Sequence, residues 1–274
     1  MLIAQITDLH VRPPGQAAYR VSETNMMAAR AIEAVAALRP APDLVVVTGD
    51  MTDCGLPAEY ELLRALLRRL PCSALMVPGN HDRREHFRAA FPDHPAMGAS
   101  GFVQFAVDHG PVRVIGLDTV VPGSSEGALC ADRLAFLEEA LAAAPERPTL
   151  ILMHHPPFDC GSAAMDRIGL KRGVEELGAI VARHSQVERI LCGHHHRPIV
   201  TRFAGTIASV APGVAHQVEL DLGETGRGML VFEPPAYELH LHRPGAGFVS
   251  HMAYVERFPG PFPFVLDPDY PGAS

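Results

Sequence analysis

The fold of this chain is constrained most strongly by four short apolar runs, at residues 43–48, 73–77, 149–153 and 189–192. They are rich in Val, Ile and Leu, and polar residues do not alternate with the apolar ones. This pattern is typical of parallel strands that are buried on both faces. Helical patterns occupy residues 23–38, 57–70 and 132–144. The alternation of strands and helices predicts a layered α/β fold.

Other segments predict that the sheets are mixed. Residues 1–6 are read as a first strand, and residues 102–107 and 112–117 are expected to form an antiparallel hairpin. Helical patterns end near residue 197, and short strands are expected around residues 200–203, 207–210, 217–222, 229–232, 237–242 and 248–255. We therefore predict a domain over residues 1–220 and a small β-rich segment over 221–274, which serves as a cap or a dimerisation element.

The composition excludes several classes of protein. The chain has 274 residues, of which 47% are hydrophobic, so it can bury a substantial core. A net charge of −8 argues against a stable nucleic-acid partner, which calls for clustered Lys and Arg. The sequence shows neither a signal peptide nor an apolar run long enough for a bilayer, so we expect a cytoplasmic protein. Five cysteines without a C-x-x-C pair favour reduced thiols.

Carboxylate, amide and imidazole side chains follow the apolar runs in five short motifs: T-D-L-H, G-D-M-T-D, G-N-H-D, M-H-H-P-P and G-H-H-H. Each motif begins where a buried strand is expected to emerge into a loop, so side chains from separate strands can converge at one edge of a sheet. Together they predict a hydrolytic site with two metal ions. The predicted metal ligands are Asp8, His10, Asp50, Asn80, His154, His194 and His196.

Spacing suggests how the ligands are shared. Asp8 and His10 are two residues apart, so they point to the same side if the strand geometry persists, and His194 and His196 repeat that spacing. The carboxylate of Asp50 has two oxygens and can bridge two cations. The alternative is a set of buried structural histidines bonded to backbone carbonyls. The recurrence of all five motifs at strand ends disfavours that alternative.

The neighbouring polar residues are expected to have other roles. His81 comes directly after a ligand and is expected to point toward a substrate, and Asp82 is expected to orient an imidazole. We favour a structural role for His155. His240 and His242 alternate in a strand, which favours a solvent-exposed face or a subunit contact.

The motifs D-x-H, G-D-x-x-D, G-N-H-D, H-H and G-H-x-H resemble the signature of the calcineurin-like metallophosphoesterases, from residue 8 to residue 196. The phrases G-D-M-T-D-C-G, M-H-H-P-P and P-G-V-A-H-Q are similar to the glycerophosphodiesterase and class III cyclic-nucleotide phosphodiesterase branch. The resemblance implies a four-layer α-β-β-α sandwich, and it extends to His216. It also implies a homo-oligomer, dimeric or larger, as in relatives that assemble in this way.

The resemblance also implies roles for the residues. One metal is assigned to Asp8, His10, Asp50 and His196, and the other to Asp50, Asn80, His154 and His194. The metals are expected to be divalent or mixed-valence ions of Fe, Mn, Co or Zn. A hydroxide that bridges the two metals would attack phosphorus, and the residues expected to act in catalysis are His81, Asn80, Asp50 and His216. For His216, an equally weighted alternative is a polar residue in a loop.

Departures from related families favour a diester substrate. Asp53 stands where purple acid phosphatases have a tyrosine ligand, and Cys54 stands where protein Ser/Thr phosphatases have a phosphate-binding arginine. His195 stands where the similar branch often has Asn. We therefore expect a phosphodiesterase for small diesters, such as glycerophosphodiesters or 3′,5′-cyclic nucleotides. The alternatives are a metallophosphatase or nuclease of the same superfamily, or a non-catalytic scaffold.

Overall fold

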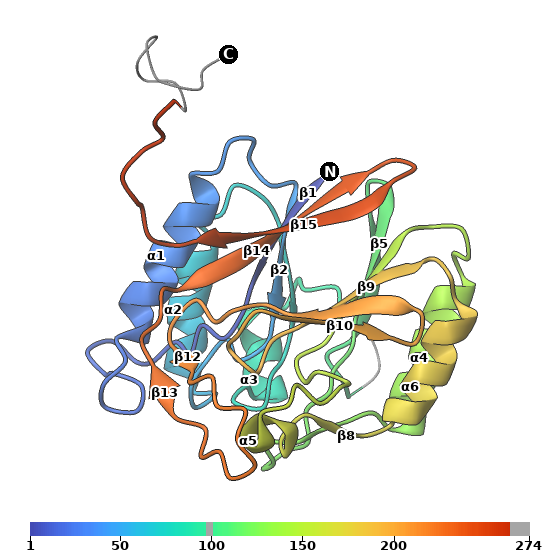
Figure 1. The fold of residues 1–274 in the computed structure, drawn as a ribbon, viewed down its shortest axis with the longest axis horizontal. Helices are drawn as coiled ribbons and strands as arrows, with labels where there is room; N and C mark the ends of the chain where they lie inside the picture. The colour runs from blue at the N-terminus through green and yellow to red at the C-terminus, as the bar shows by residue number, and fades with distance from the viewer. Residues whose placement is uncertain (97–100, 264–274) are drawn as a thin grey trace, which may run out of the picture.

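Two mixed β-sheets pack face to face in the computed structural model, which describes residues 1–96 and 101–263 (Figure 1). The five-stranded sheet has the order β15 (Gly247–Tyr254), β14 (Ala236–Arg243), β1 (Leu2–Ile6), β2 (Leu44–Thr48) and β3 (Ala74–Val77). The six-stranded sheet has the order β10 (Ile199–Phe203), β11 (Thr206–Val210), β9 (Val187–Cys192), β7 (Thr149–Leu152), β5 (Val112–Gly116) and β4 (Phe105–His109). Both sheets combine parallel and antiparallel pairs, as predicted.

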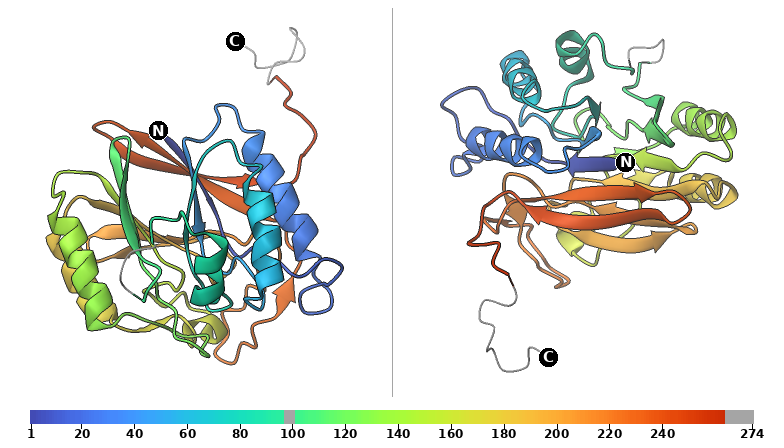
Figure 2. Two further views of the ribbon diagram at one scale, coloured as in Figure 1. Left: turned by 180° about the vertical axis from the view of Figure 1, so that it is seen from behind. Right: turned by 90° about the horizontal axis from the view of Figure 1, so that it is seen from above.

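Helices cover the outer sides of the sheets, with α1 and α2 at one side of the molecule and α4 and α6 at the other (Figure 2). The helices are α1 (Thr24–Ala36), α2 (Pro57–Leu67), α3 (Arg84–Ala90), α4 (Ala131–Ala142), the short α5 (Ala163–Asp166) and α6 (Val174–Arg183). Two small sheets are formed by β12 (Gln217–Val218) with β13 (Leu230–Val231), and by β6 (Gly127–Ala128) with β8 (Leu170–Arg172). The layered α/β architecture predicted from the sequence is thus confirmed.

Strand β7 shows how the layers are built. Leu150 and Leu152 belong to the core shared with the five-stranded sheet, whereas Ile151 belongs to a second core with Leu137 of α4 and Leu177 of α6. Successive side chains of a strand point to opposite faces, so β7 is apolar on both of its faces. This burial explains why the run at 149–153 has no polar alternation.

The last two strands complete the five-stranded sheet. β14 pairs antiparallel with β1, with Leu241 opposite Leu2, and β15 pairs with β14. The division predicted at residue 220 stays a prediction, and residues 264–274 of the C-terminal segment lie outside the described residues. The hairpin predicted near residue 110 is confirmed as β4 and β5. Strand β4 begins three residues later than predicted because Val103 donates its N–H to Asp118 Oδ2 (2.9 Å) rather than to a neighbouring strand.

Within the described residues, no helix combines the length and apolar character needed to cross a membrane. All five cysteines are free, which agrees with the expectation of reduced thiols.

Candidate metal centre

The seven predicted ligands lie in loops that follow β1, β2, β3, β7 and β9, at the ends of strands from both sheets. The first two loops run alongside each other. Asp8 N–H donates to Gly49 O (3.1 Å), and His10 N–H donates to Asp50 O (3.0 Å). These bonds continue the pairing of β1 with β2 beyond the strands and hold the first three ligands close together.

Five of the predicted ligands have a backbone conformation that is rare for residues other than glycine. Positive φ values occur at Asp8 (56°), His10 (46°), Asp50 (45°), His194 (75°) and His196 (50°). The expectation that strand alternation orients the D-x-H and H-x-H pairs is therefore wrong, because β1 and β9 end before these residues. A left-handed conformation at such residues costs about 1–3 kcal/mol each, and a concentration of such strain at one place is typical of functional sites.

His10 and His196 point their Nε2 atoms at each other at 3.2 Å. The Nδ1 of His10 lies 3.1 Å from Asp53 Oδ1, and the Nδ1 of His196 lies 2.7 Å from the carbonyl oxygen of His216. Because each Nδ1 has an acceptor for its proton, both Nε2 atoms present lone pairs to the space between them. Asp8 Oδ1 lies 3.3 Å from His196 Nε2. A cation at this point would remove the repulsion among these atoms.

A second convergence surrounds His154. Its Nε2 lies 3.2 Å from Asp50 Oδ2 and 3.2 Å from Asn80 Oδ1, while its Nδ1 lies 2.8 Å from Thr48 O. His194 is oriented through Nε2, which lies 2.9 Å from a backbone carbonyl oxygen and leaves Nδ1 as the nitrogen available to a metal. An amide oxygen, a carboxylate and two imidazoles thus meet at this point.

Asp50 belongs to both convergences. Its Oδ2 lies 3.2 Å from His154 Nε2 and 3.8 Å from His10 Nε2. Burial alone would raise the pKa of Asp50, but the imidazoles of His154 and His81 lower it, and the net pKa is well below its usual value. Burial lowers the pKa of His154, but the Asp50 carboxylate more than offsets this effect and raises it to about 9. The site therefore favours a positive charge beside Asp50.

A cavity of about 350 Å³ is lined by His81 and His216 and by five of the predicted ligands, which are His10, Asp50, Asn80, His194 and His196. His81 N–H donates to Asp50 Oδ1 (2.9 Å), and its Nδ1 lies 2.6 Å from Asp53 O. The His216 ring lies 4.7 Å from that of His196. Burial, followed by the neighbouring imidazoles, lowers the pKa of His216 to about 2. Both residues predicted to face the substrate therefore lie at the cavity.

Several residues that line this cavity were not singled out as site residues from the sequence. They include Tyr19, Ser125, Ile168 and Met229. They come from irregular loops without a recognisable spacing, so only three-dimensional proximity identifies them. The cavity wall contains neither Lys nor Arg among the described residues. Arg12 lies close by, but its Nη1 is 3.0 Å from Glu59 Oε1.

Asp82 does not orient an imidazole, contrary to our expectation. Its carboxylate accepts hydrogen bonds from the N–H groups of Gly79 (2.9 Å), Met51 (3.2 Å) and Thr52 (3.2 Å). It thereby ties the loop that carries Asp50 to the loop after β3. Backbone carbonyl groups do most of the orienting of the imidazoles instead.

The structure also shows the surroundings of three histidines that were not predicted to be ligands or substrate contacts, His155, His240 and His242. His155 is buried, with Nδ1 2.7 Å from Thr119 Oγ1, in keeping with a structural role. His240 and His242 are buried, so the prediction of a solvent-exposed face is wrong. His240 Nε2 lies 3.0 Å from Gln5 Oε1 and 3.6 Å from Glu238, because β14 is an internal strand whose face packs inside the molecule.

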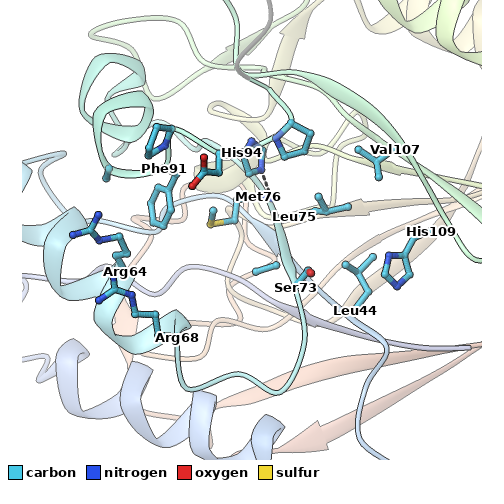
Figure 3. Close-up of a pocket in the computed structure, with 15 residues that line it drawn as sticks. Leu44, Arg64, Arg68, Ser73, Leu75, Met76, Phe91, His94, Val107 and His109 are labelled. Atoms are coloured by element: carbon cyan, nitrogen blue, oxygen red, sulfur yellow. Dashed lines mark hydrogen bonds between the residues drawn. The ribbon is translucent and has the colours of Figure 1, made fainter.

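A larger cavity, of about 530 Å³, lies away from these ligands (Figure 3). Arg64 of α2 and Arg68, which directly follows this helix, stand on one side of it, and Val107 and His109 of β4 stand on the other. None of the seven predicted ligands lines it. Its buried histidine, His94, is engaged within the fold, since Nε2 accepts the N–H of Met76 at 3.1 Å. Size alone does not locate the chemistry of this molecule.

Comparison with known proteins identifies relatives over the part of the chain that carries the seven predicted ligands. A family model described as calcineurin-like phosphoesterase matches residues 1–198. A probable glycerophosphodiester phosphodiesterase, GpdQ, of Arcobacter nitrofigilis is 34% identical, over 96% of this chain and 97% of that protein. A probable cyclic nucleotide phosphodiesterase of Rhodopseudomonas palustris is 38% identical, over 86% of each chain. The crystal structure of a dimetal phosphatase from Danio rerio has a similar fold, with a TM-score of 0.64 at 15% identity, over 93% of this chain and 99% of that chain.

Proposed function

Because the chain belongs to the calcineurin-like phosphoesterase family, we propose that it is a metal-dependent phosphodiesterase that hydrolyses small phosphodiesters. Glycerophosphodiesters and 3′,5′-cyclic nucleotides are the two candidate substrates, in line with the names of its relatives. The observation that carries the proposal is the convergence of imidazole, amide and carboxylate atoms on both sides of Asp50.

The donor set fits two ions. One would be held by Asp8, His10, Asp50 and His196, and the other by Asp50, Asn80, His154 and His194. Mixed carboxylate, amide and imidazole donors suit Fe, Mn, Co or Zn. Two such ions, when bound, offset charge on the phosphoryl oxygens and lower the pKa of a water molecule.

His81 is the residue we assign to the leaving group. Its Nδ1 is occupied by Asp53 O, so Nε2 is the nitrogen free to reach a substrate. Burial would lower the pKa of His81, but the carboxylate of Asp50 raises it above its ordinary value. The raised pKa favours the protonated imidazole, which can donate its proton to the departing alkoxide oxygen. His216 has a lowered pKa and serves as a neutral hydrogen-bonding partner for the substrate.

The cavity wall favours diesters over monoesters. A monoester carries an extra negative charge, which arginine side chains in phosphate sites usually bind in a bidentate manner. No arginine or lysine lines this cavity among the described residues, and Arg12 is held by Glu59. The oligomeric assembly and the cytoplasmic location expected from the sequence stay predictions.

The proposal is tested by metal analysis and kinetics on the purified protein. We expect about two transition-metal ions per chain and a higher kcat/KM for bis(p-nitrophenyl) phosphate than for p-nitrophenyl phosphate. Asp50→Ala should lose bound metal and nearly all activity, whereas His81→Ala should keep the metal and lose rate. A folded protein that binds no metal and cleaves neither ester after reconstitution would support the scaffold alternative instead. Cleavage of single-stranded DNA without small-diester hydrolysis would indicate a nuclease.

A further inference from the structure

The candidate metal centre depends on how the two sheets are placed relative to each other, because its predicted ligands come from both. Four ligands follow β1, β2 and β3 of the five-stranded sheet, and three follow β7 and β9 of the six-stranded sheet. Each of the two proposed ions would take ligands from both sheets. A displacement of one sheet against the other would therefore separate ligands of the same ion. A side chain that fixes the placement of the sheets can thus control metal binding without touching a metal.

Gln5 of β1 links the two sheets close to these ligands. Its side chain is buried, with the residue 0% exposed. Nε2 donates one proton to Thr48 Oγ1 of β2 (3.0 Å) and the other to Cys192 O of β9 (2.9 Å), so its two partners belong to different sheets. Each partner comes two residues before a predicted ligand, which is Asp50 in one case and His194 in the other. The amide therefore joins the ends of β2 and β9 at the point where their ligand loops begin.

The two sheets approach each other closely beside this link. A Cβ atom at Gly193, directly after β9, would lie 2.6 Å from Thr48 O, so this position requires glycine. Thr48 O also accepts the Nδ1 proton of His154 (2.8 Å). Thr48 therefore binds Gln5 through its hydroxyl group and orients a predicted ligand through its carbonyl group. Loss of the Gln5 amide would reach His154 through this one residue.

The orientation of the Gln5 amide is fixed by the groups around it. A carbonyl oxygen can only accept, so the NH₂ group faces Cys192 O and Oε1 faces His240. His240 Nε2, 3.0 Å from Oε1, therefore carries the proton, and His240 Nδ1 accepts from Ser250 Oγ (2.8 Å). Burial lowers the pKa of His240 to about 3, which is consistent with a neutral ring that has one donor and one acceptor. A single chain of hydrogen bonds thus runs from β15 through β14 and β1 to β9.

We propose that Gln5 is a positioning residue, which holds the two sheets in the relative placement that the metal ligands require. This inference rests on the proposed function, because it assigns Gln5 a role at that metal centre. The alternative is a buried amide that contributes to stability alone. The two roles differ in the metal Kd. A loss of global stability leaves the Kd unchanged as long as the folded state is fully populated, whereas misplaced ligands raise it.

The main test is Gln5→Leu, which keeps a side chain of similar size and removes all three hydrogen bonds of the amide. Metal-free protein is titrated with Co²⁺ at a temperature at which circular dichroism shows that it is folded. We expect the Kd of Co²⁺ to rise about tenfold or more, the loss that is typical when a group that orients metal ligands is removed. The visible absorption spectrum at saturating Co²⁺ should also change, because it reports the geometry of the ligands.

A second variant and its control separate this effect from the loss of any buried hydrogen bond. Thr48→Val removes only the hydroxyl group that Gln5 binds, and it should raise the Kd of Co²⁺ about threefold. The matched control is Thr149→Val. Thr149 is as buried as Thr48 (0% exposed each), but it is the first residue of β7, and its hydroxyl group bonds to Arg147 O (2.8 Å) at the end of the strand away from His154. This control should lower the stability and leave the Kd unchanged.

Two results would overturn the inference and leave the proposed function intact, provided that the Co²⁺-loaded wild type hydrolyses bis(p-nitrophenyl) phosphate. The first is an unchanged Kd and spectrum in folded Gln5→Leu. The second is an equal Kd for Thr48→Val and Thr149→Val, and this comparison decides the matter if Gln5→Leu does not fold. A wild-type protein that binds no metal would instead remove the proposed function and this inference with it.

Discussion

Replacing Asp82 should reveal how much stability the candidate site draws from a buried carboxylate that is not among the predicted ligands. Its Oδ2 accepts from the N–H groups of Met51 and Gly79, and its Oδ1 accepts from Thr52 N–H, Thr52 Oγ1 and Tyr60 Oη. Three backbone donors and two hydroxyl groups therefore depend on one side chain that is 2% exposed.

The two substitutions at this position differ in what they leave unpaired. In Asp82→Asn, the amide can turn its NH₂ toward the hydroxyls of Thr52 and Tyr60, which rotate and accept, so one N–H group loses its partner. The lost bond costs about 2 kcal/mol, but the neutral amide recovers a similar amount at pH 8 because burial raises the pKa of the carboxyl it replaces, so we expect a net change of less than about 1 kcal/mol. Asp82→Ala leaves all three backbone N–H groups without an acceptor, and the expected loss is about 5 kcal/mol, comparable with the whole stability of many domains.

The assay is equilibrium urea unfolding followed by circular dichroism at pH 8. Burial raises the pKa of Asp82 to about 6, so the carboxylate is ionised at this pH. Asp93→Asn, at an exposed position, is the matched control and should change stability by less than about 0.5 kcal/mol. Because Asp82 ties the loops that carry Asp50 and Asn80, Asp82→Ala should also weaken metal binding. A loss below about 1 kcal/mol for Asp82→Ala would refute the reasoning, since the five donors would then have found other acceptors.

Three further predictions concern the backbone, the interior and the ions. Gly49→Ala should reduce metal affinity because a Cβ there would lie 2.3 Å from His154 Nδ1. The control Gly15→Ala is also at positive φ, but a Cβ there would have no atom within 4 Å, so this variant should keep the metal. Equal losses of affinity for the two variants in metal titrations would exclude the clash as the cause. Burial raises the pKa of Glu238 to about 7, above the value of about 4.3 in an unfolded chain, so its ionisation removes stability as the pH rises through this range. Glu238→Gln should therefore gain up to about 3 kcal/mol over the wild type between pH 5 and pH 8 in urea unfolding, and a gain that does not change with pH would contradict this. Removal of the metal by a chelator should lower Tm reversibly. The expected loss of stability is about 3 kcal/mol relative to the protein with free metal at 100 times its Kd. A Tm that does not respond to metal would contradict the fit of the donor set to metal ions.

The parts of the fold that were predicted from the sequence are those with a local cause. The run at 43–48 is apolar on both faces, and β2 occupies residues 44–48 of it. Helix α3 was missed because seven residues are too few to show a helical period. Helix α6 was also missed, although Leu177, Ile180 and Val181 carry the right spacing and could have revealed it. The burial of His240 depends on which strand lies beside β14, and no local pattern records that neighbour.

The candidate site also has parts that could be predicted from the sequence and parts that could not. Residue types and their order located all seven predicted ligands at one place. The atoms that face a metal could not be predicted, because the free nitrogen of each imidazole depends on a carbonyl or carboxylate from another loop. Thr48 O selects Nε2 in His154, and Ile168 O selects Nδ1 in His194.

The pairing of β1 with β14 has a consequence for how the chain folds. The strand that carries the first ligand loop has its second neighbour more than two hundred residues later, with Leu2 opposite Leu241. During synthesis, β1 and β2 can pair early, but the other side of β1 stays unpaired until the C-terminal hairpin emerges. Such long-range pairing slows folding and exposes a hydrophobic strand edge on which other chains can assemble. Truncation before residue 236 should therefore cause aggregation rather than yield a smaller active protein, because the loops with the predicted ligands would be present but the edge of β1 would stay open.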